Sequence, residues 1–205
     1  MDLKLQGKVA FISGSTAGIG FAIAHSLLKE GVKVIINGRA ERGVADAVEK
    51  LKSLVKGADV SGLAADFGNT EEVNTLIKSL PDIDILVNNA GIFEPKPFEE
   101  IPDEDWFRFF EVNVMSGIRL SRNLFPKMLK KNWGRIIFIS SESAVFIPDE
   151  MIHYGMTKTA QLAISRGLAE LSKNTGVTVN SILPGPTKSQ GVGTFIEDLA
   201  KAGNI

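Results

Sequence analysis

Residues 8–20 read KVAFISGSTAGIG, a run of strand-forming residues that continues into a glycine-rich turn. Its first six residues hold an apolar run, Val9 to Ile12, that is rich in strand-forming side chains, which predicts a buried strand. Gly14, Gly18 and Gly20 follow, and apolar residues then recur at helical spacing over residues 21–29. Glycines between a strand and a helix permit a tight turn and let a pyrophosphate approach the helix N-terminus. The stretch therefore favours a dinucleotide-binding turn over one that needs glycine for its conformation alone.

The remaining sequence repeats this alternation of strand and helix. The predicted strands are 8–13, 32–36, 60–65, 83–87, 136–140 and 177–183, and the predicted helices are 21–29, 41–54, 71–80, 103–131 and 152–173. This order predicts an α/β fold, a Rossmann-like doubly wound parallel sheet flanked by helices, with right-handed crossovers. Because no repeat or linker interrupts the chain, we expect residues 1–205 to form a single domain. Ligands of such sheets bind beyond the carboxyl ends of the strands.

The composition excludes several classes of function. The net charge is -1 and no basic run is present, so we expect no binding to nucleic acid or to a membrane surface. The chain has no cysteine and only two histidines, His25 and His153, so we predict neither a disulfide nor a metal site. No leader-like apolar segment precedes the first strand, and no apolar run approaches the length of a membrane span. These features predict a cytoplasmic, soluble protein.

A second informative stretch, residues 139–158, reads ISSESAVFIPDEMIHYGMTK and contains the only tyrosine of the chain. Tyr154 and Lys158 are four positions apart, which places them one turn apart on one face of a helix. A phenol has a pKa of about 10, and a nearby ammonium group favours its ionised form. Ser141 adds a hydroxyl that is able to bond a carbonyl or alcohol oxygen. The stretch indicates an acid/base site, although tyrosine and lysine at this spacing also occur on solvated helix faces.

Six motifs follow one another at the predicted strand ends and in the helices. They are G-x3-G-x-G from Gly14 to Gly20, Asn88-Asn89-Ala90-Gly91, Asn113, Ser141, Tyr154-x3-Lys158 and Pro184-Gly185. In this order they resemble the short-chain dehydrogenase/reductase family over essentially the whole chain. The resemblance implies an NAD(P)-dependent oxidoreductase that interconverts a carbonyl and a secondary alcohol by hydride transfer. The alternative is a nucleotide-binding protein without turnover, either a sensor or an inactive truncated chain.

The resemblance implies a role for each motif. Tyr154 would be the general acid/base, and Lys158 would lower its pKa and hold the nicotinamide ribose. Ser141 would orient the substrate carbonyl, and Asn113 would anchor a water that links the lysine to solvent. The implied cofactor contacts come from Gly14, Ser15, Gly18, Ile19, Gly20, Arg39, Asp66, Asn89, Ala90, Gly91, Tyr154, Lys158, Pro184, Gly185 and Thr187.

Structural roles compete at several of these positions. Asp66 would contact the adenine, but it could instead cap the helix that begins near Thr70. Asn113 could simply bond backbone, and Pro184-Gly185 could be an ordinary turn. His153 lies beside Tyr154 in the sequence, yet adjacent helical residues point in different directions, so we predict no catalytic role for it.

The end of the predicted second strand bears on the choice of nicotinamide cofactor. NAD-specific relatives usually carry an acidic residue there, which bonds the ribose 2′-hydroxyl and repels a 2′-phosphate. Here that position is Gly38, followed by Arg39, whose guanidinium group suits a phosphate. Ala17 stands where many NADP-preferring relatives have a basic residue, and Arg39 could be a solvated surface charge. NADP is the favoured cofactor and NAD is the alternative.

The family pattern continues past Pro184-Gly185 into a substrate-covering helical segment, another helix and a seventh strand. Residues 195–200 would be the first turns of that segment, which is incomplete from about residue 188. A fragment, the ordered part of a longer chain and a natural short member all fit, and we favour the first two. In relatives, the helices that match 103–131 and 152–173 pack between subunits, which implies a homodimer or homotetramer.

The resemblance implies a small-molecule carbonyl or alcohol substrate without identifying it. Apolar residues are frequent in the loops that would line its pocket. They are Phe93, Val145, Phe146, Ile147 and Met151. These side chains favour a partly hydrophobic substrate, although loop side chains of this kind serve packing as often.

Overall fold

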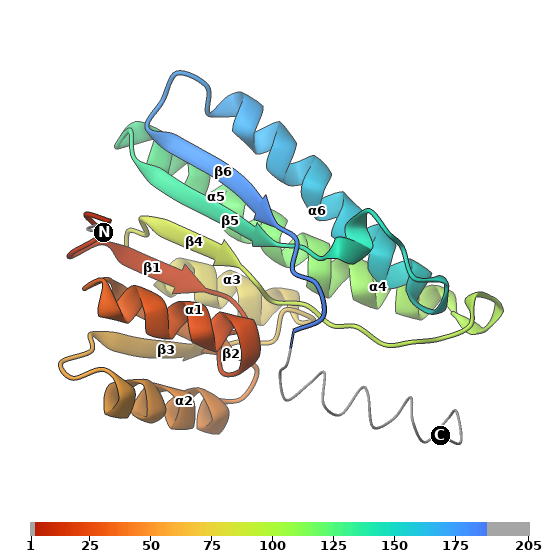
Figure 1. Ribbon diagram of the computed structural model, residues 1–205, viewed down its shortest axis with the longest axis horizontal. Helices are drawn as coiled ribbons and strands as arrows, with labels where there is room; N and C mark the ends of the chain where they lie inside the picture. The colour runs from red at the N-terminus through yellow and green to blue at the C-terminus, as the bar shows by residue number, and fades with distance from the viewer. Residues whose placement is uncertain (1–2, 188–205) are drawn as a thin grey trace.

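The computed structural model describes residues 3–187, whose strands form one six-stranded parallel sheet (Figure 1). The strands are β1 (Val9–Ile12), β2 (Lys33–Gly38), β3 (Val60–Ala64), β4 (Ile85–Asn88), β5 (Gly134–Ile139) and β6 (Val177–Ile182). Their order in the sheet is β3-β2-β1-β4-β5-β6, and every neighbouring pair is parallel. Because the winding reverses between β1 and β4, this is the doubly wound sheet that the sequence predicted.

Helices cover both faces of the sheet, so the strands are apolar on both sides (Figure 1). The helices are α1 (Gly18–Lys29), α2 (Glu41–Leu54), α3 (Thr70–Ser79), α4 (Asp103–Phe110), α5 (Ser116–Lys130) and α6 (Ile152–Leu171). Alternate residues of β1 belong to different cores: Ile12 packs with Leu28 of α1, whereas Phe11 packs with Leu124 of α5. The period of two in a strand thus divides the core into two layers.

The single helix predicted over residues 103–131 has an interruption in the structure. A π-helical segment, η2 (Glu111–Met115), joins α4 to α5 and contains Asn113. Segments of this kind occur frequently at functional sites. The prediction of one continuous helix over residues 103–131 is therefore wrong at this segment.

Short 3-10 turns shape the loops after β4 and β5. They are η1 (Phe98–Glu100), η3 (Glu142–Ala144) and η4 (Asp149–Met151). The other differences from prediction are at element ends, since α1 begins at Gly18 instead of Phe21 and β5 begins at Gly134 instead of Ile136. The covering segment predicted at residues 195–200 lies outside the described residues. Between residues 3 and 187, no helix is both long and apolar enough to cross a membrane.

Candidate active site

Six of the predicted site residues follow the carboxyl ends of the six strands, the edge toward which the arrows of Figure 1 point. Gly14 follows β1, Arg39 follows β2, Asp66 follows β3, Asn89 follows β4, Ser141 follows β5 and Gly185 follows β6. The parallel topology therefore brings together segments that are far apart in the sequence. This edge is where doubly wound sheets bind their ligands.

The glycine-rich turn leads into a helix N-terminus that no side chain caps. The α1 N-cap, Ala17, makes no side-chain cap hydrogen bond, and the first turn of the helix holds no acidic residue. The backbone N–H groups and the positive end of the helix dipole are suited to an anion. At Gly20, an added Cβ would lie 2.6 Å from Asn89 Nδ2 and 2.7 Å from the Gly14 carbonyl oxygen. Gly20 is thus required by close packing of the turn against the loop after β4.

Hydrogen bonds from the ends of β1, β2 and β4 hold this turn in place. Asn89 Nδ2 donates to the carbonyls of Ser13 at 3.0 Å and Gly14 at 2.7 Å. Ser13 Oγ accepts from the backbone N–H groups of Asn89 and Ala90, each at 2.9 Å. Asn37 Oδ1 accepts from the Gly14 N–H at 3.1 Å. The Asn89 side chain, predicted to line the adenosine site, therefore braces the turn itself.

Ser15 is buried, and the fold uses both of its polar groups. Its hydroxyl donates to the Ile12 carbonyl at 2.6 Å and accepts from the Asn37 N–H at 2.9 Å, and its own N–H donates to the Asn37 carbonyl at 2.7 Å. Contact of Ser15 with a cofactor stays a prediction, and its role in the structure is to brace the turn. Asn37 was missed as a contributor, although a polar residue near the end of an apolar strand was a usable signal.

The end of β2 has no space for the acidic residue of NAD-specific relatives. Gly38 is buried, and a Cβ added there would lie 2.5 Å from Thr16 Cγ2. Arg39 is exposed, and the α2 N-cap, Ala40, makes no side-chain cap hydrogen bond. The described surface beyond β2 therefore offers a cation and backbone N–H groups.

Asp66 does not cap α3, which corrects one of the two roles considered for it. The N-cap is Asn69, whose Oδ1 accepts from the N–H groups of Glu71 at 3.0 Å and Glu72 at 3.4 Å. Asp66 Oδ1 instead accepts from the Gly68 N–H at 2.8 Å, in the turn after β3. Its contact with an adenine stays a prediction.

Tyr154 and Lys158 lie one turn apart on α6, and Lys158 Nζ is 5.5 Å from the centroid of the tyrosine ring. Burial raises the pKa of Tyr154, and a hydrogen bond with Ser141 acts in the opposite direction. Burial lowers the pKa of Lys158 to about 8. The lowering of the Tyr154 pKa by Lys158, which the resemblance implies, stays a prediction.

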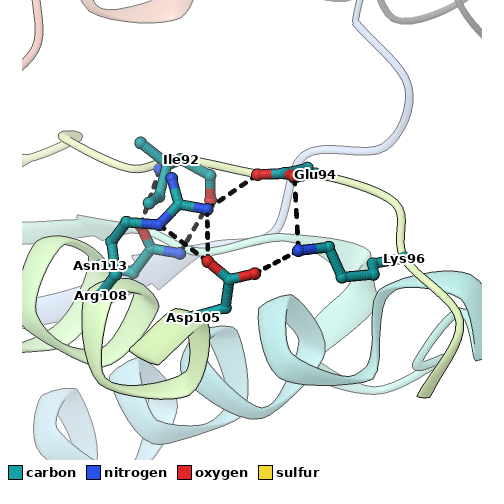
Figure 2. Close-up of polar contacts among 6 residues, drawn as sticks. All are labelled: Ile92, Glu94, Lys96, Asp105, Arg108 and Asn113. Atoms are coloured by element: carbon teal, nitrogen blue, oxygen red, sulfur yellow. Dashed lines mark hydrogen bonds and ion pairs between the residues drawn. The ribbon is translucent and has the colours of Figure 1, made fainter. Parts of the chain in front are cut away.

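Asn113 fastens the loop after β4 to the helical layer (Figure 2). Its Oδ1 accepts from the Ile92 N–H at 2.7 Å, and its Nδ2 donates to the Ile92 carbonyl at 2.9 Å and to Thr157 Oγ1 at 3.0 Å. The side chain therefore bonds backbone, as the structural alternative held. Its own carbonyl accepts from Gln161, a buried residue that sequence reasoning missed. A usable signal was its spacing, three positions after Lys158 on the same helix face.

The two serines after β5 have different contacts: Ser141 bonds within the candidate site, and Ser140 links β5 to α6. Ser141 Oγ accepts from the Ser143 N–H at 3.1 Å and is the hydroxyl that bonds Tyr154. Ser140 Oγ donates to the Lys158 carbonyl at 2.9 Å and so joins β5 to α6. The Glu142 N–H donates to the Pro184 carbonyl at 3.0 Å. That bond holds the segment after β6 against the residue that follows Ser141.

The remaining predicted positions lie on the same edge. Thr187 is exposed, and its hydroxyl donates to the Gly185 carbonyl at 2.9 Å. The backbone at Gly91 runs close to the lysine, since a Cβ added there would lie 3.5 Å from Lys158 Nζ. Ile19 is half-buried in the first turn of α1. Only the contacts of these residues with a ligand stay predictions.

Four charged side chains form a closed set of ion pairs beside the site (Figure 2). Arg108 Nη2 lies 2.8 Å from Glu94 and 3.0 Å from Asp105, and Lys96 pairs with Asp105 and, at 3.9 Å, with Glu94. The ammonium of Lys96 holds the pKa of Asp105 below its usual value. The Lys96 N–H also donates to the Glu150 carbonyl at 2.8 Å. The loop after β4 is thereby fixed to α4 and to η4.

His153 points into an aromatic cluster. Its ring is fully buried, 4.1 Å from the ring of Phe109 and 5.9 Å from that of Trp106, measured between centroids. Neither ring nitrogen has a hydrogen-bond partner in the described part of the chain, and burial lowers its pKa. These contacts make His153 part of the packing behind Tyr154.

The fold and its carboxyl edge define a nucleotide-binding type of α/β domain with a tyrosine-lysine site. Residues 8–200 match the family model described as short chain dehydrogenase. The chain is also 51% identical over 205 residues to the uncharacterized oxidoreductase YvaG of Bacillus subtilis (strain 168), covering all of this chain and 78% of that protein. The chain therefore belongs to the short-chain dehydrogenase family, and the prediction of an oxidoreductase is confirmed.

Two solved structures are similar to this fold over nearly its whole length. The L-sorbose reductase of Gluconobacter frateurii, complexed with NADPH and L-sorbose, has a TM-score of 0.91 and 34% identity, covering 98% of this chain and 78% of that one. A variant of actinorhodin polyketide ketoreductase with NADPH has a TM-score of 0.90 and 28% identity, covering 97% and 78%. Both resemble this chain in fold across the described site.

Proposed function

We propose that this oxidoreductase interconverts a carbonyl and a secondary alcohol by hydride transfer, with Tyr154 as the general acid/base. The observation that carries the proposal is the gathering of Ser141, Tyr154 and Lys158 where β5 ends and α6 begins. A hydrogen-bonding hydroxyl, a proton donor and a cation are what carbonyl reduction requires at the oxygen atom. The alternative is a nucleotide-binding protein without turnover. It gains no support here, because the hydroxyl, the proton donor and the cation are all present in the site.

The residues present fit a nicotinamide dinucleotide. The N-terminus of α1 would take the pyrophosphate, because its N–H groups lack a side-chain cap and Gly20 keeps the approach free of a side chain. Lys158 would hold the nicotinamide ribose, and Thr187 would bond the carboxamide. The bound cofactor supplies a hydride to the substrate carbon or accepts one from it.

Side chains of the protein would donate the proton to the substrate oxygen or accept it from there. Ser141 would donate a hydrogen bond to the carbonyl, and Tyr154 would pass its phenolic proton to that oxygen as the carbon gains the hydride. The ammonium of Lys158 would stabilise the phenolate that remains. In alcohol oxidation each step runs in reverse. Since burial raises the pKa of Tyr154 in the free protein, the cation and the Ser141 bond must offset that cost.

NADP is the cofactor that the residues after β2 favour. Gly38 leaves no space for a carboxylate that would repel a 2′-phosphate, and Arg39 is exposed and able to pair with one. The two solved relatives described above hold NADPH. NAD stays the alternative, because the glycine-rich turn itself carries no basic residue.

The walls around Tyr154 suit a substrate with an apolar part. The Phe93 ring contacts Tyr154 edge-on at 6.3 Å between centroids, and Val145, Phe146 and Ile147 are largely exposed on the loop after β5. Exposed apolar side chains that gather beside a reactive group favour binding of apolar surface. A homo-oligomeric state and a cytoplasmic location remain predictions.

Replacement of the tyrosine tests the proposal. NADPH oxidation, followed by absorbance with a panel of ketones and aldehydes, should show turnover in the unmodified chain. Tyr154→Phe should lower kcat by about 1,000-fold, the order of a lost general acid, and leave NADPH affinity within about twofold. Ser140→Ala is the matched control, because its hydroxyl serves the β5–α6 contact. Unchanged turnover in Tyr154→Phe would remove that residue from the mechanism.

A further inference from the structure

The buried side chain of Gln161 hydrogen-bonds two residues of the site, Lys158 and Asn113. It is 2% exposed, its Nε2 donates to the Asn113 carbonyl at 2.6 Å, and its Oε1 accepts from Lys158 Nζ at 3.4 Å. Gln161 and Lys158 lie on one face of α6, whereas Asn113 lies in the π-helical segment η2. The carboxamide therefore joins the catalytic helix to the segment that fastens the loop after β4.

Lys158 has few polar partners. From β5 it meets the Ile139 carbonyl at 3.0 Å, and from its own helix it meets Gln161 and the ring of Tyr154. The backbone at Gly91 passes nearby. No ion pair between residues 3 and 187 involves Lys158. In the described site, Gln161 is the side chain that offers the ammonium a hydrogen-bond acceptor.

The orientation of the carboxamide follows from its two partners. The Asn113 carbonyl requires a donor and the Lys158 ammonium requires an acceptor, so only one orientation of the amide satisfies both. Leucine at this position would satisfy neither partner. Glutamate would keep an acceptor for Lys158 but would turn an oxygen toward the Asn113 carbonyl.

We propose that Gln161 is a positioning residue, which holds the Lys158 ammonium beside Tyr154 in its charged form and ties it to Asn113. The inference rests on the proposed function, because the charge on Lys158 matters through the phenolate of Tyr154. The Asn113 carbonyl has two lone pairs. One of them accepts the hydrogen bond from Gln161 Nε2.

The direct test measures the titration of Lys158 in three proteins. The side-chain ¹³Cε signal of Lys158 in lysine-labelled protein, assigned by its loss in Lys158→Met, is followed against pH. Gln161→Leu should lower the pKa of Lys158 by about one unit, and Gln161→Glu should raise it by about one unit. Ser165→Ala, on another buried position of α6, is the control and should leave the signal unchanged.

Opposite shifts in the two variants support the proposal. Equal pKa values of Lys158 in all three proteins, or shifts of the same sign in both variants, would overturn it. A residue with only a structural role would not shift the pKa of Lys158 in opposite directions in the two variants. If Gln161→Leu does not fold, Gln161→Glu is sufficient to test the proposal. A pKa of Lys158 that is not raised in Gln161→Glu would contradict it. This readout needs no turnover, so an inactive unmodified chain would count against the proposed function and leave the inference standing.

Activity gives a second readout. Gln161→Leu should lower kcat by about tenfold, a loss of about 1.4 kcal/mol, and move the pH profile of kcat/KM, with NADPH affinity unchanged. Gln161→Glu should move the profile in the opposite direction. Coincident profiles in both variants and the unmodified protein would contradict the role.

Discussion

The two halves of the carboxyl edge are stabilised in opposite ways. On the cofactor side, Ser13, Asn37 and Asn89 all have hydrogen-bond partners, and these bonds fix the glycine-rich turn. On the catalytic side, Lys158 is buried without an ion pair in the described chain, and Phe146 is 80% exposed. Native proteins break local stability rules mainly at functional sites. The half proposed to bind the cofactor is therefore held in place by satisfied hydrogen bonds, whereas the half proposed to carry the chemistry keeps groups that cost stability.

The largest effect should come from removal of the buried cation. The pKa of Lys158 falls from 10.5 to about 8 on folding. Below pH 8 the folded state must hold a proton that the unfolded chain binds more tightly, so Lys158 costs stability there. That cost falls as pH rises from about 8 to 10.5. Lys158→Met should therefore raise the free energy of unfolding at pH 7 by about 3 kcal/mol, and the gain should shrink toward pH 10.

Urea unfolding at pH 7 and pH 10 measures this difference. Lys127→Met, at an exposed position on α5, is the matched control and should change stability by less than about 0.5 kcal/mol at either pH. A Lys158→Met protein that is less stable than the unmodified chain at pH 7 would contradict the view that the catalytic half carries an uncompensated charge.

The cofactor half should respond most strongly to crowding of its turn. Gly20→Ala places a methyl group against Asn89 and Gly14, so the turn must move. NADPH affinity, measured by fluorescence titration, should fall by about 100-fold, the order expected for a displacement near an ångström. Gly167→Ala, on α6 where no atom lies within 4 Å of the added Cβ, should bind normally and melt slightly higher. Equal affinity in both variants would refute the role assigned to Gly20.

The residue after β2 tests the cofactor side at its exposed edge. Arg39→Ala should weaken NADPH about tenfold, within the range of a hydrogen bond to a charged group, and leave NADH unchanged. Calorimetric titration with both cofactors separates the two results. Arg122→Ala, exposed on α5, provides the control. Equal losses for NADPH and NADH would mean that Arg39 does not contact a 2′-phosphate.

The smallest effect should come from the ion pairs of the catalytic side. Arg108→Met removes one of the two cations that Glu94 and Asp105 share and leaves Lys96 as the other, so the loop after β4 becomes less firmly held. Half-exposed pairs contribute less than about 1 kcal/mol, so KM for the carbonyl substrate should rise about threefold with NADPH affinity unchanged. Arg166→Met, which breaks an exposed pair on α6, should leave KM unchanged. A change in NADPH affinity in place of KM would put this cluster on the cofactor side.

Much of this architecture was predictable from the sequence, because the periodicity of apolar residues and the spacing of glycines depend on residues that are close together in the chain. The strands, their parallel order and the turn at Gly14 all follow from them. The supporting contacts do not. Asn37 reaches Gly14 from the neighbouring strand, Gln161 reaches Asn113 from another helix, and the π-helical turn lies inside a stretch that was predicted as one helix. Asn69, and not Asp66, caps α3, since the choice between two nearby polar residues depends on where the chain turns.

Side-by-side titration of the purified chain with NADPH and NADH, followed by nicotinamide fluorescence, tests the central claim most directly. We expect saturable binding of both cofactors at the carboxyl edge, with NADPH the tighter by about tenfold and with NADPH affinity about 100-fold lower in Gly20→Ala. A preference for NADH would contradict the assignment of Arg39. Binding of neither cofactor would contradict the assignment of the glycine-rich turn as a dinucleotide site in this chain.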